Sequence, residues 1–323
     1  MEINRLKNKQ LATLFKPLYT KQYVQVKNAF EKGDLKEDTE LIVFNVGSKH
    51  LAFSKHKMSF HHIAQGYVNE QPYMLTFCVI CNSGMIMNPV VNGKMLHFYI
   101  AGAYNGMLFM ADKETNSYWD HITGECVSGK HKGKQLKILQ SHQILTAKEV
   151  LEQYSDCLYG QEKINFLQRL FASFATKKGN VRGKGFLPPN FRASMQKIDD
   201  RLPEMEMGLG LWKGKTAKFY PTKVIKENGN YLFDQWDNKN LIVYISPTTH
   251  TPSAMQIEKI DSAAFDGDKL ILSDGKYIQS GNLYSSEEVK IDTNQPNQVF
   301  LRWYGFVSTF PNIEIKIMSK ITT

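Results

Sequence analysis

The chain has 323 residues, of which 42% are hydrophobic and 22% charged, a composition that excludes collagen-like, low-complexity and wholly disordered chains. Its 40 Lys and Arg against 31 Asp and Glu give a net charge of +9, but these residues are spread along the chain and predict no specific nucleic-acid binding. No apolar run could cross a bilayer and residues 1–17 are too polar for a secretory signal. The sequence as written therefore predicts a cytoplasmic protein, or an exported one if a leader was removed.

The first half of the chain predicts a helical start and then strands. Spaced apolar residues over 1–39 favour one or two short amphipathic helices. From residue 40 the pattern changes to a hairpin over 41–53, a buried strand over 73–81 and a second hairpin around Asn92-Gly93. We therefore expect a first β-rich domain at 40–146.

A helical bridge is expected over 147–190. Thr146 and Glu149 have the spacing of a capping box at the start of a helix. A second helix is expected over 165–176, and the glycine- and proline-rich stretch 179–190 then predicts a linker.

Beyond residue 200 the strand pattern returns in the same order, which suggests an internal duplication. Three pairs of stretches match: 46–53 with 212–219, 73–84 with 241–253, and 143–159 with 298–315. The expected fold is therefore α+β and β-rich, with two tandem divergent copies of one mainly antiparallel β domain joined by a helical segment, the second copy at 191–323. The second copy has no cysteine, so we expect it to lack the chemistry of the first.

The pair Cys78 and Cys81 is the main chemical signal. Four cysteines in so long a chain are too few for a disulfide scaffold. Two thiolates at C-x-x-C spacing can bind one soft metal ion if the turn after them brings both sulfurs together. His61 and His62 are the nearest candidates for further ligands, which would give a transition-metal site for zinc, copper or iron.

Two other interpretations of the pair remain open. Thiol-disulfide redox chemistry needs a lowered thiol pKa, which a following helix often supplies, but Asn82, Ser83 and Gly84 break a helix. Alternatively, both thiols pack as small hydrophobic groups. Strict strand alternation would place Cys78 and Cys81 on opposite faces, so the turn must bend the chain for the sulfurs to meet.

The order of motifs resembles the domain of unknown function 3179 family. It comprises a histidine stretch, the C-x-x-C, Tyr104-Asn105, a D-x-x-T-x-S-x-W block from Asp112 to Trp119, and a following T-G-E. The resemblance is good over residues 40–156 and weaker beyond 200. It implies a duplicated β-rich fold and candidate positions, but no reaction, because the family is named for lacking an assigned activity.

The chain also departs from the family pattern. It has His61-His62 and Gln65-Gly66 where the family usually shows H-E and a later N-D, and Val79 in place of a proline. His61 falls at the family's histidine and is favoured over His62 as a ligand for that reason.

Three further residues are candidates for catalysis. Tyr104, Asn105 and Asp112 could line a pocket for a small-molecule substrate, with Asp112 as a general base. The competing interpretation is structural, with the Asp and Ser of the block bonding backbone amides and Trp119 anchoring the loop. His121 and Cys126 are weaker metal candidates.

The function expected from the sequence is therefore metal binding, in a metalloenzyme of unassigned reaction with a Cys/Cys/His site. The alternatives are a thiol-disulfide redox protein using Cys78 and Cys81, or a non-catalytic binding or scaffold protein with a structural metal. Whether the chain is an enzyme, and its oligomeric state, stay open.

Overall fold

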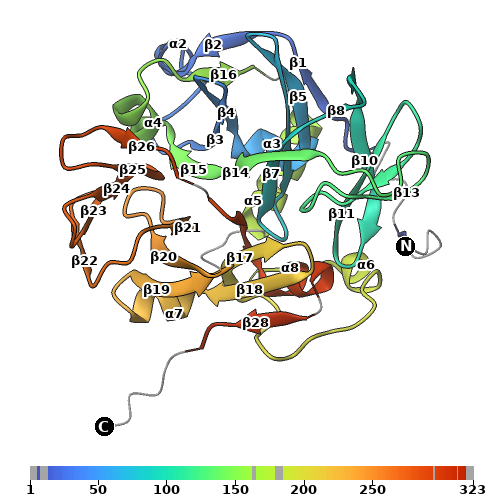
Figure 1. The fold of residues 1–323 in the computed structure, drawn as a ribbon. Coiled ribbons are helices and arrows are strands. Elements are labelled where there is room, and N and C mark those ends of the chain that lie inside the picture. Colours follow the sequence, from blue (N-terminus) through green and yellow to red (C-terminus); the bar gives the residue numbers. More distant parts are fainter. Residues whose placement is uncertain are drawn as a thin grey trace. The chain divides into compact units, whose positions relative to one another are not determined.

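The computed structural model describes residues 6–7, 14–161, 165–178, 185–293, 295–310 and 312–317 (Figure 1). Contacts within the chain divide it into two compact units. Unit 1 comprises 1–205 and 301–311, and unit 2 comprises 206–300 and 312–323. Residues 191–205 and 301–311, which the sequence assigned to the second domain, thus group with unit 1.

The expectation of a β-rich, mainly antiparallel fold is confirmed. Strands hold 45% of the residues and helices 17%. In the part of the chain that is described, no helix is both long and apolar enough to cross a membrane.

Unit 1 contains three larger sheets and a small hairpin. The sheet β1-β5-β6-β7-β14 consists of β1 (Leu18–Thr20), β5 (Ile63–Val68), β6 (Gln71–Cys78), β7 (Ser83–Asn88) and β14 (Lys137–Ser141). The sheet β15-β3-β4-β16-β2 consists of β15 (Gln143–Thr146), β3 (Glu40–Val46), β4 (Lys49–Ser54), β16 (Leu158–Gly160) and β2 (Tyr23–Gln25). The sheet β10-β11-β12-β13 consists of β10 (Phe98–Tyr104), β11 (Met107–Asp112), β12 (Tyr118–Trp119) and β13 (Cys126–Ser128). The small hairpin consists of β8 (Val90–Val91) and β9 (Lys94–Met95).

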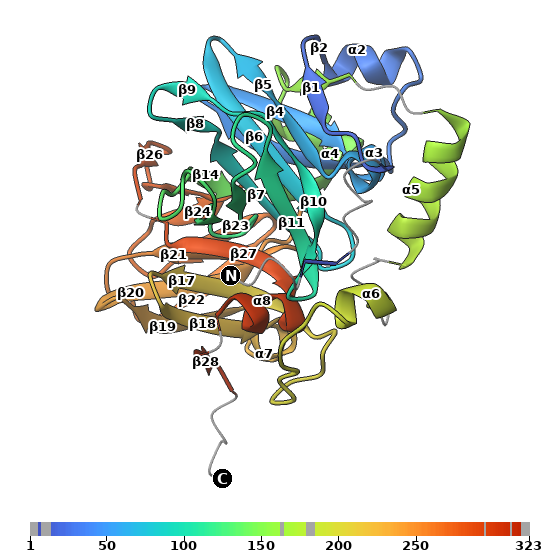
Figure 2. The same cartoon turned by 90° about the vertical axis from the view of Figure 1, so that its right-hand side faces the viewer.

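Six helices of unit 1 lie in the described residues (Figure 2). They are α2 (Val26–Glu31), α3 (Lys55–His61), α4 (Ala147–Gln153), α5 (Phe166–Lys178), α6 (Pro189–Arg192) and α8 (Trp303–Thr309). The predicted capping box is present at α4, because Thr146 Oγ1 accepts a hydrogen bond from the Glu149 amide while the Glu149 carboxylate accepts one from the Thr146 amide.

Strand β6 is the centre of unit 1. Its residues Tyr73, Leu75 and Phe77 pack with β3 and β4 in one core cluster, and the alternate residues Met74, Thr76 and Cys78 are buried too. A strand that is buried on both faces has a nearly continuous run of apolar residues in its sequence. The end of β6 therefore places Cys78 inside the protein, on the face opposite Phe77.

Two local predictions for unit 1 need correction. The segment 1–39 was expected to contain one or two short helices; α2 is one, but the strands β1 and β2 precede it, and residues 1–5 and 8–13 lie outside the described part. Pairing with β5 and β16 outweighs the helical spacing of this segment. The strand expected over 73–81 spans Gln71–Cys78, so Cys81 lies in the turn that follows it. The hairpin at Asn92-Gly93 is confirmed, with φ values of +51° and +75°.

Unit 2 contains three further sheets and the helix α7 (Thr222–Glu227). The sheet β27-β17-β18-β28 consists of β27 (Asn297–Arg302), whose last two residues group with unit 1, β17 (Met207–Lys213), β18 (Thr216–Pro221) and β28 (Ile313–Ile315). The sheet β19-β20-β21 consists of β19 (Tyr231–Trp236), β20 (Lys239–Ile245) and β21 (Pro252–Gln256). The sheet β22-β23-β24-β25-β26 consists of β22 (Ala263–Asp266), β23 (Lys269–Leu272), β24 (Tyr277–Gln279), β25 (Asn282–Tyr284) and β26 (Lys290–Ile291).

Candidate functional site

The C-x-x-C occupies the turn between β6 and β7. Cys78 ends β6 and pairs with Ser83, the first residue of β7. Asn82, just before β7, has a φ of +54°, a left-handed conformation that asparagine tolerates better than most residues. This turn bends the chain enough for the two sulfurs to interact, although both cysteines remain free thiols.

A chain of hydrogen bonds runs from Cys81 to a buried histidine. Cys81 Sγ lies 2.8 Å from Ser83 Oγ, which lies 2.8 Å from His121 Nε2. Cys81 and Ser83 have no exposed surface, and His121 is 3% exposed. If the imidazole is protonated, His121 donates to the serine oxygen and the serine hydroxyl donates to the sulfur, so the arrangement can stabilise a thiolate.

The turn after β12 holds His121 in place. The carboxylate of Asp120 accepts hydrogen bonds from the amides of Ile122 and Thr123, both at 2.8 Å. The carbonyl oxygen of His121 accepts a bond from the Thr76 hydroxyl of β6 at 3.4 Å. The local D-H-I-T-G sequence thus forms an Asx-type turn that directs the imidazole toward the C-x-x-C.

The two thiols are electrostatically unequal. Burial opposes a thiolate at Cys81, but hydrogen bonds from Cys78 and His121, the charge of His121 and the Ser83 hydroxyl together hold its pKa well below the ordinary value. Burial and the neighbouring Cys81 sulfur raise the pKa of Cys78 well above it. Burial also opposes the charged form of His121, yet the Cys81 sulfur raises the pKa of this imidazole. These directions favour a thiolate at Cys81 over one at Cys78, and they favour the protonated form of His121 beside it.

The segment 301–311 completes the site from far along the chain. The backbone amide of Arg302 donates to the Cys81 carbonyl at 3.0 Å, and its Nε donates to the Ile80 carbonyl at 3.0 Å. The guanidinium also donates to the Met205 carbonyl at 2.9 Å, and Arg302 is only 1% exposed. These bonds fix the carbonyls of Ile80 and Cys81 and add a positive charge near the sulfurs.

Tyr304 brings a phenol against Cys81. Its ring is buried, and burial together with the two sulfurs raises the pKa of this hydroxyl well above its usual value, so the phenol keeps its proton. Among the described residues the hydroxyl has no hydrogen-bond partner of ordinary geometry. The Tyr304 phenol is therefore a proton donor near the Cys81 sulfur, and no other described residue accepts a hydrogen bond from it.

Helix α8 approaches the turn closely through Gly305. A Cβ atom at this position would lie 3.6 Å from the Cβ of Cys81 and 2.9 Å from Met107 Sδ, so a larger residue would push the helix away. Asn105 supports the other end of α8, because its side-chain amide donates to the Ser308 carbonyl at 3.3 Å. This predicted catalytic residue thus contacts the helix that carries Tyr304.

The predicted histidine ligands are each bonded to backbone. His61 Nδ1 lies 2.8 Å from the Lys16 carbonyl oxygen, and His62 Nδ1 lies 2.9 Å from the Phe77 carbonyl oxygen. Over the described ranges, no three His, Cys, Asp or Glu side chains are grouped so that they could hold a metal ion. Cys78 and Cys81 come together as predicted, but a transition metal at this site stays a prediction without a third ligand.

The D-x-x-T-x-S-x-W block forms a loop whose polar groups bond one another. The buried carboxylate of Asp112 accepts from the Thr115 amide at 2.6 Å, from its hydroxyl at 2.8 Å and from Trp119 Nε1 at 2.9 Å. These contacts favour the structural interpretation of the block. A catalytic role for Asp112 or for Tyr104, whose ring packs 5.2 Å from that of Phe109, stays a prediction.

Sequence reasoning did not identify several members of this site. His121 was considered only as a weak metal candidate, and Ser83 only as a helix-breaking residue. Arg302 and Tyr304 carried no signal at all, because nothing in the local sequence shows that α8 packs on the C-x-x-C turn. The Asp120 turn was the one local sign that His121 is held rigidly.

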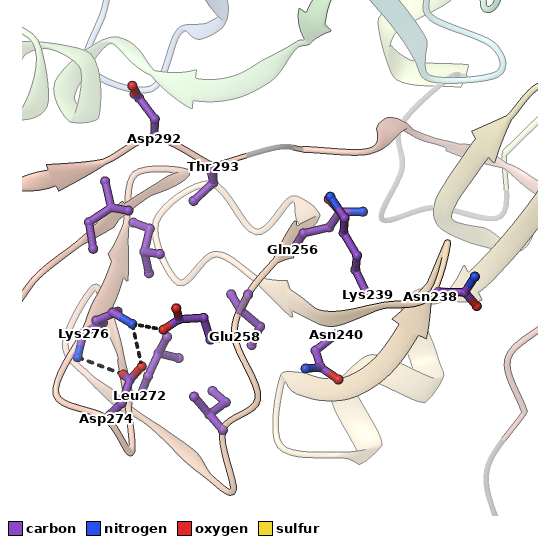
Figure 3. A pocket seen from close by; sticks show the side chains of 14 residues that line it. Asn238, Lys239, Asn240, Gln256, Glu258, Leu272, Asp274, Lys276, Asp292 and Thr293 are labelled. Atoms are coloured by element: carbon purple, nitrogen blue, oxygen red, sulfur yellow. Dashed lines mark hydrogen bonds and ion pairs between the residues drawn. The ribbon is translucent and has the colours of Figure 1, made fainter.

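Unit 2 has a cavity of about 560 Å³, and three of the five charged residues that line it form ion pairs with one another. Figure 3 shows the Lys276 ammonium between the carboxylates of Glu258 and Asp274, with Asn240, Gln256 and Lys239 on the other side of the view. Much of the remaining lining is apolar, from the residues Ile257, Ile260, Leu272, Leu283 and Ile291. The paired charges point to a structural role for the lysine, and this cavity offers no thiol or imidazole.

Comparison with known proteins gives a family but no assigned relative. Neither the search of curated proteins nor the search of solved structures found a match. The sequence model described as "Protein of unknown function (DUF3179)" matches residues 17–299. This range contains the C-x-x-C and His121 but ends before Arg302.

Proposed function

The chain belongs to the DUF3179 family, and we propose that in this member the C-x-x-C turn is a dithiol redox centre, with Cys81 as the attacking thiolate and Cys78 as the partner thiol. The proposal depends mainly on the hydrogen-bond chain from Cys81 Sγ through Ser83 Oγ to His121 Nε2, in which both distances are 2.8 Å. The thiolate, not the thiol, is the nucleophile, and a histidine in this position increases the fraction of the cysteine that is a thiolate.

Burial limits the reactant to a small molecule. Cys78 and Cys81 each have 0% exposure, so a protein disulfide cannot reach either sulfur while the turn is folded. A hydroperoxide is small enough to enter through fluctuations of the packing and reacts with thiolates. We therefore assign the oxidant to the hydroperoxide class and the reductant to small thiols.

The reaction balances with the groups present. Cys81 Sγ attacks the terminal oxygen of the hydroperoxide; the S–O bond forms, the O–O bond breaks, and the leaving alkoxide or hydroxide takes a proton from Tyr304 or the His121 imidazolium. Cys78 then gives its proton to the group that was deprotonated in the first step, Tyr304 or His121, and attacks Cys81 Sγ; the S–S bond forms, the S–O bond breaks, and the released hydroxide takes that proton to become water. Two equivalents of a small thiol reduce the disulfide again.

The test uses Cys157 as a control within the same unit. Cys157 is also buried, but burial raises its pKa to about 12, so its thiolate fraction at pH 7 is on the order of 10⁻⁵. The reduced protein is treated with hydrogen peroxide, remaining thiols are alkylated after unfolding, and each cysteine is scored by mass spectrometry. We expect a Cys78–Cys81 disulfide while Cys157 stays reduced.

Variants separate the roles of the two thiols. Cys78→Ser should stop at a sulfenic acid on Cys81, which a dimedone-type reagent traps, and Cys81→Ser should show no oxidation at residue 78. His121→Asn should slow oxidation of Cys81 and raise its pKa, measured from thiolate ultraviolet absorbance. Equal oxidation of Cys81 and Cys157, or an unchanged Cys81 pKa in His121→Asn, would refute the proposal. Stoichiometric zinc, copper or iron bound through both sulfurs would return the site to the metal interpretation.

We also infer that unit 2 is a divergent copy of unit 1. In unit 1 the hairpin β3-β4, helix α3 and strands β5-β6-β7 are followed by β15 beside β3, α4, and β16 parallel to β4. Beyond residue 206 the hairpin β17-β18, helix α7 and strands β19-β20-β21 are followed by β27 beside β17, then α8, which groups with unit 1, and β28 parallel to β18. An experimental structure in which these two sets of elements superpose in order would test the inference.

The second copy has hydroxyls where the first has thiols. Ser246 Oγ lies 3.0 Å from Thr248 Oγ1 and accepts a bond from the Thr249 amide at 3.2 Å, in the turn that follows β20. Redox chemistry is therefore expected in unit 1 alone.

A further inference from the structure

Helix α5 turns most of its bulky apolar residues away from the protein; Phe171, which packs against Phe15 and Phe60, is the exception. Phe166, Leu167, Leu170 and Phe174 are 70%, 73%, 53% and 58% exposed. The residues that α5 buries are the small Ala172 and Ala175. An ordinary surface helix has the reverse arrangement, with its large apolar side chains toward the core.

The four i, i+4 rows of α5 show how the exposed face is built. The row Gln168, Ala172 and Thr176 faces the protein, and Thr176 Oγ1 lies 3.2 Å from the hydroxyl of Ser59 in α3. The neighbouring row of Leu167, Phe171 and Ala175 passes from exposed to buried.

The other two rows of α5 point to solvent. Phe166, Leu170 and Phe174 form an exposed apolar row, and Asn165, Arg169, Ser173 and Lys177 form an exposed polar and basic row beside it. The exposed apolar row of α5 therefore lies directly beside a row that carries the basic side chains of Arg169 and Lys177.

The charged residues of α5 are all basic, with Arg169 and Lys177 exposed and no Asp or Glu in the helix. Helix α3, against which α5 packs (Figure 2), adds Lys57, whereas its Lys55 is buried and paired with Glu40. A second copy of the same surface would bring like charges together without an opposite charge to pair with them.

We propose that the exposed face of α5 docks on an anionic phospholipid surface. A bordering row of Lys and Arg beside a Phe and Leu face is the arrangement of helices that lie in the membrane interface. The apolar row would enter the boundary of the acyl chains, while Arg169 and Lys177 meet the lipid phosphates. This interaction needs no membrane-spanning helix and is independent of the proposed redox chemistry.

The test is co-sedimentation with vesicles made of phosphatidylcholine alone or mixed with phosphatidylglycerol. We expect binding to the mixed vesicles that weakens as salt is added. Replacing the apolar row, in the variant Phe166→Gln/Leu170→Gln/Phe174→Gln, should weaken this binding at least about tenfold. Arg169→Gln/Lys177→Gln should remove most of the preference for anionic lipid.

A matched control replaces exposed apolar residues elsewhere. Tyr67→Gln and Val289→Gln change side chains that are 50% and 59% exposed, and they should leave vesicle binding unchanged. Circular dichroism checks the fold of each protein, and Leu167→Gln alone serves as the apolar variant if the triple variant unfolds.

Three results would overturn the proposal. They are wild-type protein that does not bind mixed vesicles, an apolar-row variant that binds them as well as the wild type, and a wild-type dimer that the apolar-row variant abolishes while neither protein binds vesicles. The last result would assign the face to a second copy of the chain.

Discussion

Acid should destabilise unit 1 through a buried neutral histidine. His142 Nδ1 bonds the Gly84 carbonyl oxygen at 2.9 Å, and burial, with a smaller contribution from the Lys55 charge, lowers its pKa to about 4. In the unfolded chain a histidine titrates near 6.5. Because the folded pKa lies below the unfolded one, only the unfolded chain gains the proton between these values. The stabilisation by neutral His142 is thus fully present above about pH 6.5 and is lost as the pH falls toward 4.

The two pKa values set the size of the effect. Between pH 7.5 and pH 5 the free energy of unfolding should fall by about 2 kcal/mol for this one residue. That is a large fraction of the roughly 5 to 15 kcal/mol by which ordinary domains are stable. His62 adds a loss of the same sign, because burial lowers its pKa to about 4. Its hydrogen bond to Phe77 opposes this shift, and the charges of His61 and His121 add to it.

The assay is urea unfolding of the wild type and of His142→Asn at both pH values, followed by tryptophan fluorescence. An asparagine amide can still donate to Gly84 but cannot gain a proton. The variant should therefore lose about 2 kcal/mol less than the wild type between the two pH values. His250→Asn, at an exposed position with a φ of +50° that asparagine tolerates, is the control and should follow the wild type. An identical pH dependence in His142→Asn and the wild type would refute the reasoning.

Three other substitutions test local contacts within unit 1. Asp112→Asn should lower the free energy of unfolding by about 1 to 3 kcal/mol, because the single amide oxygen cannot accept from both Thr115 and Trp119 and the amide nitrogen accepts no hydrogen bond; unchanged stability in urea would weaken the structural interpretation. Glu149→Ala should cost about 1 kcal/mol by removing half of the capping box, measured by thermal unfolding, with Glu152→Ala beyond the first turn as the comparison. Gly84→Ala should cost about 1 to 3 kcal/mol in urea unfolding, because its Cβ would lie 2.7 Å from the Thr76 carbonyl oxygen and 2.9 Å from His142 Nδ1; a variant as stable as the wild type would contradict this close approach.

The elements that were predictable are those whose signals lie within a few residues. The capping box of Thr146 and Glu149, the Asn92-Gly93 turn and the β3-β4 hairpin each depend on adjacent side chains and backbone angles. β1 was missed because its stability comes from parallel pairing with β5, which begins more than 40 residues later. Local spacing carries no record of such a partner.

The site was predictable only in its sulfurs. Sequence spacing identified Cys78 and Cys81 and the need for the turn to bend. It could not show that His121 supplies the charge partner, because the link passes through Ser83 on a different strand. Arg302 lies 222 residues from Ile80, whose carbonyl it bonds, and no periodic pattern connects positions so far apart.

This separation has a consequence for biosynthesis. A ribosome that adds about 5 to 20 residues per second needs roughly 10 to 45 s to translate the 222 residues between Ile80 and Arg302. During that interval the C-x-x-C turn of a nascent chain lacks the cover of α8, so both thiols are open to alkylating and oxidising agents. We expect a ribosome-bound chain stalled before residue 301 to react with a bulky alkylating reagent at Cys78 and Cys81, whereas the released protein shields both thiols from a reagent of that size.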